Sequence, residues 1–136
     1  MVMQPGLLDT STLLLLNRVA DPAELPEIPS ISAITLAELS VGPLVAKTEE
    51  ERAARQAHLQ LAEADFDPIP FDSAAARAFA RVAHSFREAG RKPSARAFDA
   101  LIAATAISRD LPLHTCNPAD FAGIPDLDLR PVAVTL

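Results

Sequence analysis

The stretch FDALIAATA, residues 98–106, is almost entirely apolar and holds a single ionisable residue, Asp99. A helix that is apolar on every side is expected to be buried in the fold. Burying an ionised acid without partners costs several kcal/mol or forces the acid to take up a proton. The segment therefore predicts that charged or polar groups from elsewhere in the chain stand beside Asp99.

Size and composition favour one globular domain over residues 1–136, because 49% hydrophobic residues can supply a core. The single cysteine, Cys116, cannot form an internal disulfide, so a reduced, cytoplasmic location is expected. The first sixteen residues, MVMQPGLLDTSTLLLL, lack a basic leader, and their apolar run is too short to span a bilayer. We expect no membrane role.

The formal net charge of -6 argues against a protein that coats nucleic acid non-specifically. The charge is unevenly spread, however, since residues 87–97 carry four basic side chains against one acidic one, a net charge of +3. The basic residues are Arg87, Arg91, Lys92 and Arg96. Two interpretations of this segment stay open: a solvated loop between helices, or a guide for a polyanion toward Asp99.

Short apolar runs alternate with helical patterns along the chain. Strands are expected at residues 6–9, 31–34, 67–71, 111–115 and 128–136. Helices are expected at 10–18, 35–43, 49–64, 73–89 and from about 94 to 108. Residues 20–30, which hold three prolines, are expected to form a loop. The alternation predicts an α/β fold with a central, mostly parallel sheet flanked by helices.

Several residue types mark the ends of these elements. Thr48 and Glu51 have the spacing of a capping box, and Asp72 can cap the helix that follows it. Gly90 is expected to end that helix. Pro131 favours a position at the edge of the sheet for the last strand, because proline cannot donate a ladder hydrogen bond.

Four acids occupy positions where sites form in open α/β sheets, beyond the carboxyl ends of the strands. Three follow expected strands and one heads the buried helix: Asp9, Glu38, Asp120 and Asp99. Each has a simpler structural explanation by itself, since Asp9 fits a helix N-cap, Thr35 with Glu38 fits a capping box, and an aspartate is common in turns. Together the four acids suggest one acidic pocket.

Carboxylates that crowd together raise one another's pKa, so a pocket of this kind needs a cation to stay ionised. Oxygen ligands without a paired histidine or cysteine suit Mg²⁺ or Mn²⁺. A carboxylate-held divalent ion activates water and stabilises the charge of a phosphoryl group. The residues therefore favour the chemistry of nucleases and phosphatases.

The segments LLDTSTLL, ITLAEL, FDALIAATA and TCNPADF, in this order and at these separations, resemble a PIN-domain ribonuclease of the VapC toxin type. The resemblance runs from Leu7 to about Leu129. It implies a PIN-like three-layer sandwich and places the family's metal-binding acids at Asp9, Glu38, Asp99 and Asp120. Supporting polar positions correspond to Thr10 or Ser11, Thr115 and Asn117. Cys116 departs from the pattern, since relatives often carry a basic residue there.

The resemblance implies an Mg²⁺-dependent endoribonuclease that is toxic to its host cell and is held in check by a small VapB-type antitoxin. It also implies a homodimer, and an antitoxin helix and tail lying in a groove near the acids. Asp9, Asp99 and Asp120 are then expected to bind the metal directly or through water, with Glu38 holding the metal or orienting the attacking water. Contacts to RNA phosphates are expected from Arg91, Lys92 and Arg96.

Two other functions stay open from the residues alone. A phosphoacceptor signalling domain shares the outline of a small α/β sheet with an Mg²⁺ pocket, but it needs adjacent acids early in the chain and a lysine after a late strand. Neither Lys47 nor Lys92 follows an expected strand. A catalytically silent α/β interaction module is the second alternative, and it does not explain why four acids occupy these positions.

Overall fold

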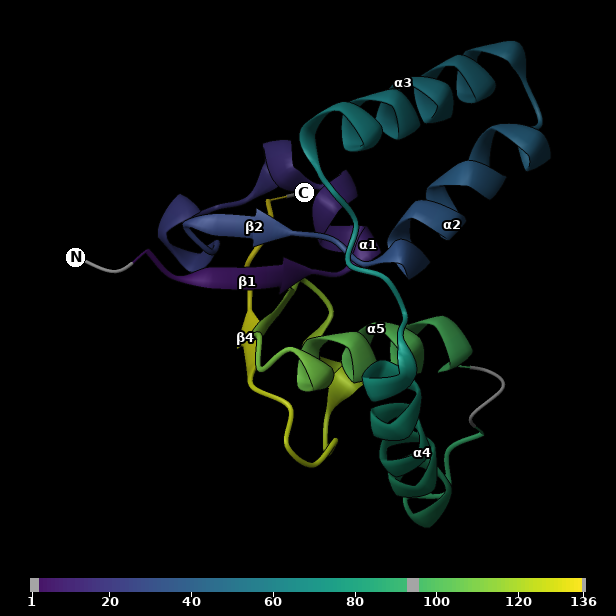
Figure 1. The fold of residues 1–136 in the computed structure, drawn as a ribbon. Helices are drawn as coiled ribbons and strands as arrows, with labels where there is room; N and C mark the ends of the chain where they lie inside the picture. The colour runs from purple at the N-terminus through teal and green to yellow at the C-terminus, as the bar shows by residue number, and fades with distance from the viewer. Residues whose placement is uncertain (1–2, 93–95, 136) are drawn as a thin grey trace.

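A four-stranded parallel sheet forms the centre of the computed structural model, which describes residues 3–92 and 96–135. The strands are β1 (Pro5–Leu8), β2 (Ile28–Ser30), β3 (Leu113–Thr115) and β4 (Leu129–Pro131), in the order β2-β1-β3-β4. Every neighbouring pair is parallel. The predicted α/β fold with a parallel sheet is confirmed (Figure 1).

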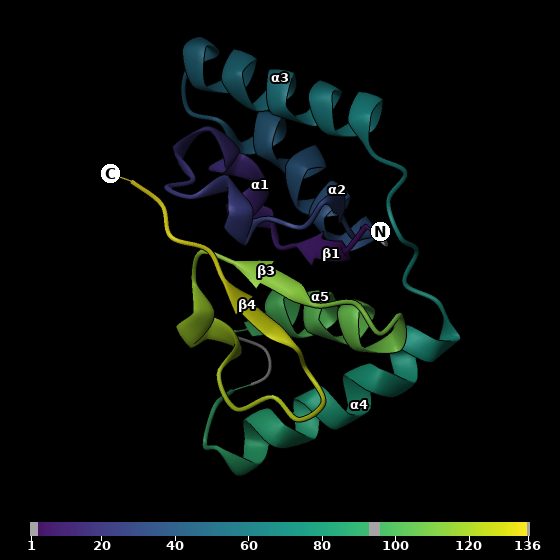
Figure 2. The same ribbon diagram turned by 90° about the vertical axis from the view of Figure 1, so that its left-hand side faces the viewer.

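Helices cover both faces of the sheet and complete three layers (Figure 2). The α-helices are α1 (Thr10–Leu14), α2 (Ala33–Val41), α3 (Glu49–Asp65), α4 (Ser73–Glu88) and α5 (Ala97–Ser108). Short 3-10 turns are η1 (Leu16–Arg18), η2 (Pro22–Glu24), η3 (Gly42–Val45) and η5 (Pro118–Phe121). In the part of the chain that the structure describes, no helix has the length and apolar character needed to cross a membrane.

Two hydrophobic clusters lie on opposite faces of the sheet. Leu7 packs with residues of α4 and α5, including Phe86 and Ile102, whereas its neighbour Leu8 packs with Ile31 and Leu39. Successive side chains of a strand point to opposite faces, so β1 contributes one leucine to each cluster. Both helical layers therefore pack against β1, the strand that directly precedes Asp9.

Helix α5 is buried along most of its length, as the apolar pattern predicts. The side chains of Ala100, Ile102, Ala103, Ala104, Thr105 and Ala106 are all at most 1% exposed. Helix α5 begins at Ala97, and the expected start near Ser94 lies outside the described residues. Small alanine side chains let the helix approach the sheet and α4 closely.

The predicted strand at residues 31–34 and the predicted loop at residues 20–30 are wrong. Strand β2 lies three residues earlier, at Ile28–Ser30, and α2 already begins at Ala33. The hydroxyl of Ser32 accepts a hydrogen bond from the Thr35 amide at 3.1 Å and starts the helix there. Because β2 is an edge strand, Pro29 is tolerated within it.

The predicted strand at residues 67–71 is reduced to one parallel bridge between Ile69 and Ser32. Pro68 and Pro70 flank Ile69, and neither has an amide hydrogen with which to extend the ladder. The last strand is also shorter than predicted and ends at Pro131, beyond which Val134 forms an isolated antiparallel bridge. The edge position predicted from Pro131 is confirmed.

Most of the predicted helix ends are confirmed. The Thr48 hydroxyl accepts from the Glu51 amide at 3.0 Å, and the Asp72 carboxylate accepts from the Ala75 amide at 3.0 Å. The Glu51 carboxylate completes its side of the cap on the Lys47 amide, one residue before the position that a capping box uses. Gly90 follows α4 with a φ of 75°, a conformation that favours glycine.

Gly6 in the middle of β1 allows a close approach between strands and side chains. A Cβ atom built on Gly6 would stand 2.6 Å from Nε2 of His114 and 2.7 Å from Cβ of Pro26. His114 is held in place because its Nδ1 lies 2.9 Å from the carbonyl oxygen of Glu24. A side chain at position 6 would therefore push β1 away from its neighbours.

We predict that Gly6→Ala lowers the free energy of unfolding by about 1–3 kcal/mol, the usual cost of overpacking a core. Urea denaturation measures the change. Gly42→Ala is the matched control, because its Cβ would meet only the Arg55 side chain, at 3.4 Å, and its φ of -46° is helical. Equal stability of the two variants would contradict this account of β1.

Candidate active site

Asp9 follows β1 directly, at the carboxyl edge of the sheet, and is only 4% exposed. Its Oδ1 accepts a hydrogen bond from the Thr12 amide at 3.0 Å, so Asp9 is the N-cap of α1. Its Oδ2 accepts from the Thr115 hydroxyl at 2.7 Å, and Thr115 is the last residue of β3. The cap and the site are therefore compatible, since one carboxylate oxygen serves the helix and the other faces the neighbouring strand.

Glu38 reaches the same edge of the sheet from α2. The Thr10 hydroxyl donates to Oε1 of Glu38 at 2.7 Å and lies 2.9 Å from the hydroxyl of Thr35, which is fully buried. The capping-box interpretation of Thr35 with Glu38 is wrong, because Ser32 caps α2. The Glu38 side chain is instead held by the residue next to Asp9.

Asp99 and Asp120 meet through an arginine. Asp99 lies in the first turn of α5, and Asp120 lies in η5 after β3. Nη1 of Arg96 stands 2.9 Å from Oδ1 of Asp120 and 3.8 Å from Oδ2 of Asp99. Both acids are partly buried, with side chains 28% exposed for Asp99 and 32% for Asp120.

The pKa of Asp99 is raised from its ordinary 3.8 to about 6, and burial is the largest cause. The negative charges of Asp120, Asp9 and Glu38 contribute to this rise, whereas Arg96 opposes it. The three other acids singled out from the sequence thus act electrostatically on Asp99. We call the region around Asp99 that these four carboxylates share the acidic pocket.

The supporting polar residues are placed unequally. Thr10 and Thr115 contact Glu38 and Asp9 through their hydroxyls. Ser11 is half-buried beside Thr10 in the first turn of α1. The side chain of Asn117 is exposed, and its backbone amide donates to the Thr115 hydroxyl at 2.9 Å.

The basic residues near the pocket have contacts of their own. The Arg91 guanidinium donates to the carbonyl oxygen of Ala119 at 2.9 Å and lies 5.3 Å from the centre of the Phe86 ring. It therefore holds the turn that carries Asp120. Lys92 is exposed. A role of Arg91, Lys92 and Arg96 in binding phosphates stays a prediction.

Two threonines were not predicted from the sequence to support the site, since Thr12 was given no role and Thr35 only that of a capping box with Glu38. Thr12 is fully buried, its amide caps onto Asp9, and its hydroxyl accepts from the Cys116 amide at 3.0 Å. Thr35 supports Thr10 from α2. Thr12 and Thr35 each lie three residues after an N-cap, Asp9 and Ser32 respectively, and a threonine at that position carries no distinctive pattern.

The chemistry of the pocket fits a hard divalent cation. Its donors are carboxylate and hydroxyl oxygens, which suit such a cation. A cation would also offset the negative charges of the acids around Asp99. In residues 3–92 and 96–135, however, no three His, Cys, Asp or Glu side chains are already arranged to hold a metal ion. Threonine hydroxyls and Arg96 occupy carboxylate oxygens in the arrangement observed.

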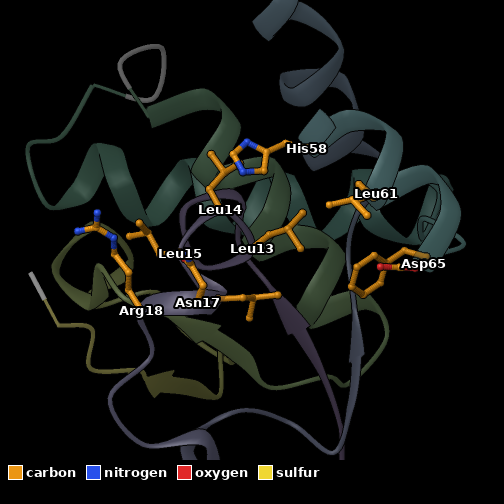
Figure 3. A pocket seen from close by; sticks show the side chains of 11 residues that line it. Leu13, Leu14, Leu15, Asn17, Arg18, His58, Leu61 and Asp65 are labelled. Atoms are coloured by element: carbon orange, nitrogen blue, oxygen red, sulfur yellow. The ribbon is translucent and has the colours of Figure 1, made fainter. Parts of the chain in front are cut away.

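A mostly apolar groove of about 580 Å³ runs between α1 with its continuation η1 and helix α3. Leu13 and Leu14 line one side, and His58 and Leu61 line the other (Figure 3). Leu61, on the polar helix α3, is 60% exposed. A groove of exposed leucines of this kind is typical of a protein-binding surface.

The chain matches the family model described as "PIN domain" over residues 7–126. It is 41% identical over 121 residues to Ribonuclease VapC5 of Mycobacterium tuberculosis, which covers 88% of this chain and 87% of the relative. It is also 40% identical over 101 residues to Ribonuclease VapC8 of the same species, covering 74% of this chain and 89% of the relative.

The fold is similar to that of a chain in the crystal structure of VapBC-5, a member of the VapBC family of toxin-antitoxin systems from Mycobacterium tuberculosis. The TM-score is 0.81 at 38% sequence identity, over 94% of this chain and 98% of that one. The likeness therefore extends to the segments that carry all four acids.

The pKa of Asp99 predicts how the metal-free protein responds to pH. The folded pKa of about 6 lies above the ordinary 3.8, so the folded state binds more protons between these values and loses stability as pH rises through them. We predict that Asp99→Asn stabilises the protein at pH 7.5 in EDTA by about 1–2 kcal/mol, a value discounted for solvent screening of the partly exposed side chain.

At about pH 3 the same substitution should change the free energy of unfolding little, because that pH lies below both 3.8 and about 6 and Asp99 is then largely protonated in the folded and unfolded states. Urea unfolding of both proteins at the two pH values gives the comparison. A difference in stability that is independent of pH would contradict the assigned environment of Asp99.

Proposed function

Because the chain belongs to the PIN domain family, we propose that it is a metal-dependent endoribonuclease and the toxin of a type II toxin-antitoxin pair. The observation that supports this proposal is the effect of the negative charges of Asp9, Glu38 and Asp120 on Asp99, in a chain 41% identical to a ribonuclease. We regard residues 1–136 as a single PIN-like domain, in line with the family match over residues 7–126.

We assign the metal site to Asp9, Asp99 and Asp120, which would hold Mg²⁺, or alternatively Mn²⁺, directly or through water. Oxygen donors without thiolate or imidazole partners support a hard cation. When bound, such a cation supplies a water of lowered pKa and positive charge for a phosphate oxygen.

The protein's own residues then orient the reacting groups. Asp9 is fixed at both oxygens, by the Thr12 amide and the Thr115 hydroxyl, so its direction toward the pocket is set before any ligand arrives. Glu38 is directed by Thr10 and either helps to hold the metal or orients the attacking water. The RNA chain approaches along the basic segment, where Lys92 and the neighbouring arginines offset the negative charge of the pocket.

A VapB-type antitoxin is the partner supported by the similarity to VapBC toxin-antitoxin structures. We propose that its helix lies in the apolar groove between α1 and α3, because the exposed leucines there suit the apolar face of a helix. The homodimer implied by the family stays a prediction that sedimentation can test. A phosphoacceptor domain or a silent interaction module finds no support among the relatives, whose names are those of ribonucleases.

We predict that Asp9→Asn and Asp99→Asn each reduce RNA cleavage by about 100-fold or more, because each removes a charge that stabilises the reacting centre. Excess EDTA should abolish cleavage by the wild type. Cleavage of total cellular RNA, followed by sequencing of the new ends, provides the measurement and identifies the target.

Asp110→Asn is the matched control, since Asp110 is exposed at the end of α5 and its φ of 51° is one that asparagine tolerates. The Asp110→Asn variant should cleave RNA at the wild-type rate. Full activity of the wild type in EDTA would exclude the proposed mechanism.

The groove yields a separate prediction about antitoxin binding. Leu61→Asp places a charge on an exposed groove residue and should weaken binding of the antitoxin at least about tenfold without unfolding α3. Leu44→Asp, at a leucine that is 84% exposed in η3 and outside the groove, is the control. Calorimetry with the purified antitoxin measures both, and equal affinities of the two variants would place the antitoxin elsewhere.

A further inference from the structure

Arg96 connects two acids of the pocket that come from different parts of the fold. It is the N-cap residue of α5, and its Nη1 stands 2.9 Å from Asp120 in η5 and 3.8 Å from Asp99 in the first turn of α5. The hydrogen bond to Asp120 spans 24 positions in the sequence. One guanidinium therefore sits where two of the proposed metal ligands converge.

The same position is where a divalent cation would neutralise the acids. Asp9, Glu38 and Asp120 act on Asp99 with negative charge, and the guanidinium acts on it with positive charge. A carboxylate oxygen that accepts a hydrogen bond from Arg96 uses for it a lone pair that could otherwise bind a metal ion. The guanidinium and a metal ion at the same place would also repel each other, because both are positively charged. The guanidinium and a metal ion thus compete for the same oxygens.

The competition is one that a metal ion can win. The Arg96 side chain is 43% exposed and long, so it can leave the pocket without disturbing the core. Ion pairs at this exposure stabilise a protein only weakly, whereas carboxylates hold a divalent ion by direct coordination. Because a metal ion has to displace Arg96 before it can bind, the presence of Arg96 lowers the metal affinity without abolishing it.

We propose that Arg96 is an internal counter-ion that holds Asp99 and Asp120 together in the metal-free protein and must be displaced when a divalent cation binds. Arg96 is then a positioning residue that sets the metal concentration at which the site fills. This inference rests on the proposed metal-dependent function. It adds a residue that is not a metal ligand and that lowers the affinity of the site for metal.

The test measures metal binding directly, by titrating Mn²⁺ and Mg²⁺ into protein stripped with EDTA, with calorimetry and the metal-induced rise in Tm as readouts. Arg96→Gln should bind Mn²⁺ about three- to tenfold more tightly than the wild type, since it loses two weak ion pairs and a repelling charge. Arg96→Lys keeps the charge and should bind within about twofold of the wild type. Its Tm in the absence of metal should also stay near that of the wild type, whereas Arg96→Gln should be less stable without metal and gain more on adding it.

Arg109→Gln is the matched control at the other end of α5. Arg109 is 42% exposed and pairs with Asp72 at 3.5 Å, so its loss removes the same positive charge together with one exposed ion pair. Its metal affinity should equal that of the wild type. Arg96→Met, which keeps an aliphatic stem, repeats the charge removal if the glutamine variant unfolds.

The outcomes separate this inference from the function on which it rests. If the wild type binds metal, and both Arg96→Gln and Arg96→Met bind it with the same or lower affinity, the counter-ion role is overturned. The metal site itself then remains supported. Tighter binding in Arg109→Gln or in Arg96→Lys, to the same extent as in Arg96→Gln, overturns it as well. No divalent ion bound by the wild type or by any Arg96 variant overturns both the inference and the proposed metal-dependent function.

Discussion

Burial of α5 against the sheet and α4 is the constraint on which the pocket depends. The helix has no polar stripe with which to face solvent, and its alanine-rich sides pack into the core around Leu7 and Leu113. Once the helix is seated there, its first turn must lie near the carboxyl ends of β1 and β3. Asp99 is thereby placed near the acids that follow these strands, and its pKa rises mainly because the side chain is buried and further because of these negative charges. The free energy gained by burying the rest of the helix offsets the cost of placing one carboxylate among others.

The charge of this pocket is balanced by neutral and cationic donors from the chain itself. Asp9 receives a backbone amide and a hydroxyl, and Glu38 receives the Thr10 hydroxyl. Asp120 is paired with Arg96. Each of these three acids therefore has at least one hydrogen-bond donor from the chain itself. The protein can therefore fold with the acids in place before a cation arrives.

The sequence was sufficient to predict features that depend on local pattern. The buried helix, the parallel sheet, the N-caps at Thr48 and Asp72 and the glycine stop at Gly90 all follow from periodicity and residue type. It misplaced β2, because prolines indicated a loop and Ser32 was not recognised as the residue that starts α2. Prolines disfavour a strand inside a sheet, but β2 lies at the edge of the sheet, where a proline is tolerated.

The candidate site was predictable as a set of acids but not as a network. That Arg96 reaches Asp120 depends on how η5 returns toward α5, which no local spacing encodes. The same holds for the contact of Thr35 with Thr10, which joins two helices from different parts of the chain.

The contacts of Thr10 fix a direction as well as a position. A threonine hydroxyl has one hydrogen, and in Thr10 that hydrogen is donated to Glu38. The hydrogen shared between Thr10 and Thr35 must then belong to Thr35, so both O–H dipoles point the same way, from the interior of α2 toward the carboxylate. A neutral chain of two hydroxyls thus extends polarity from the core to Glu38, and replacing either threonine by valine would break this polarised chain without changing any charge.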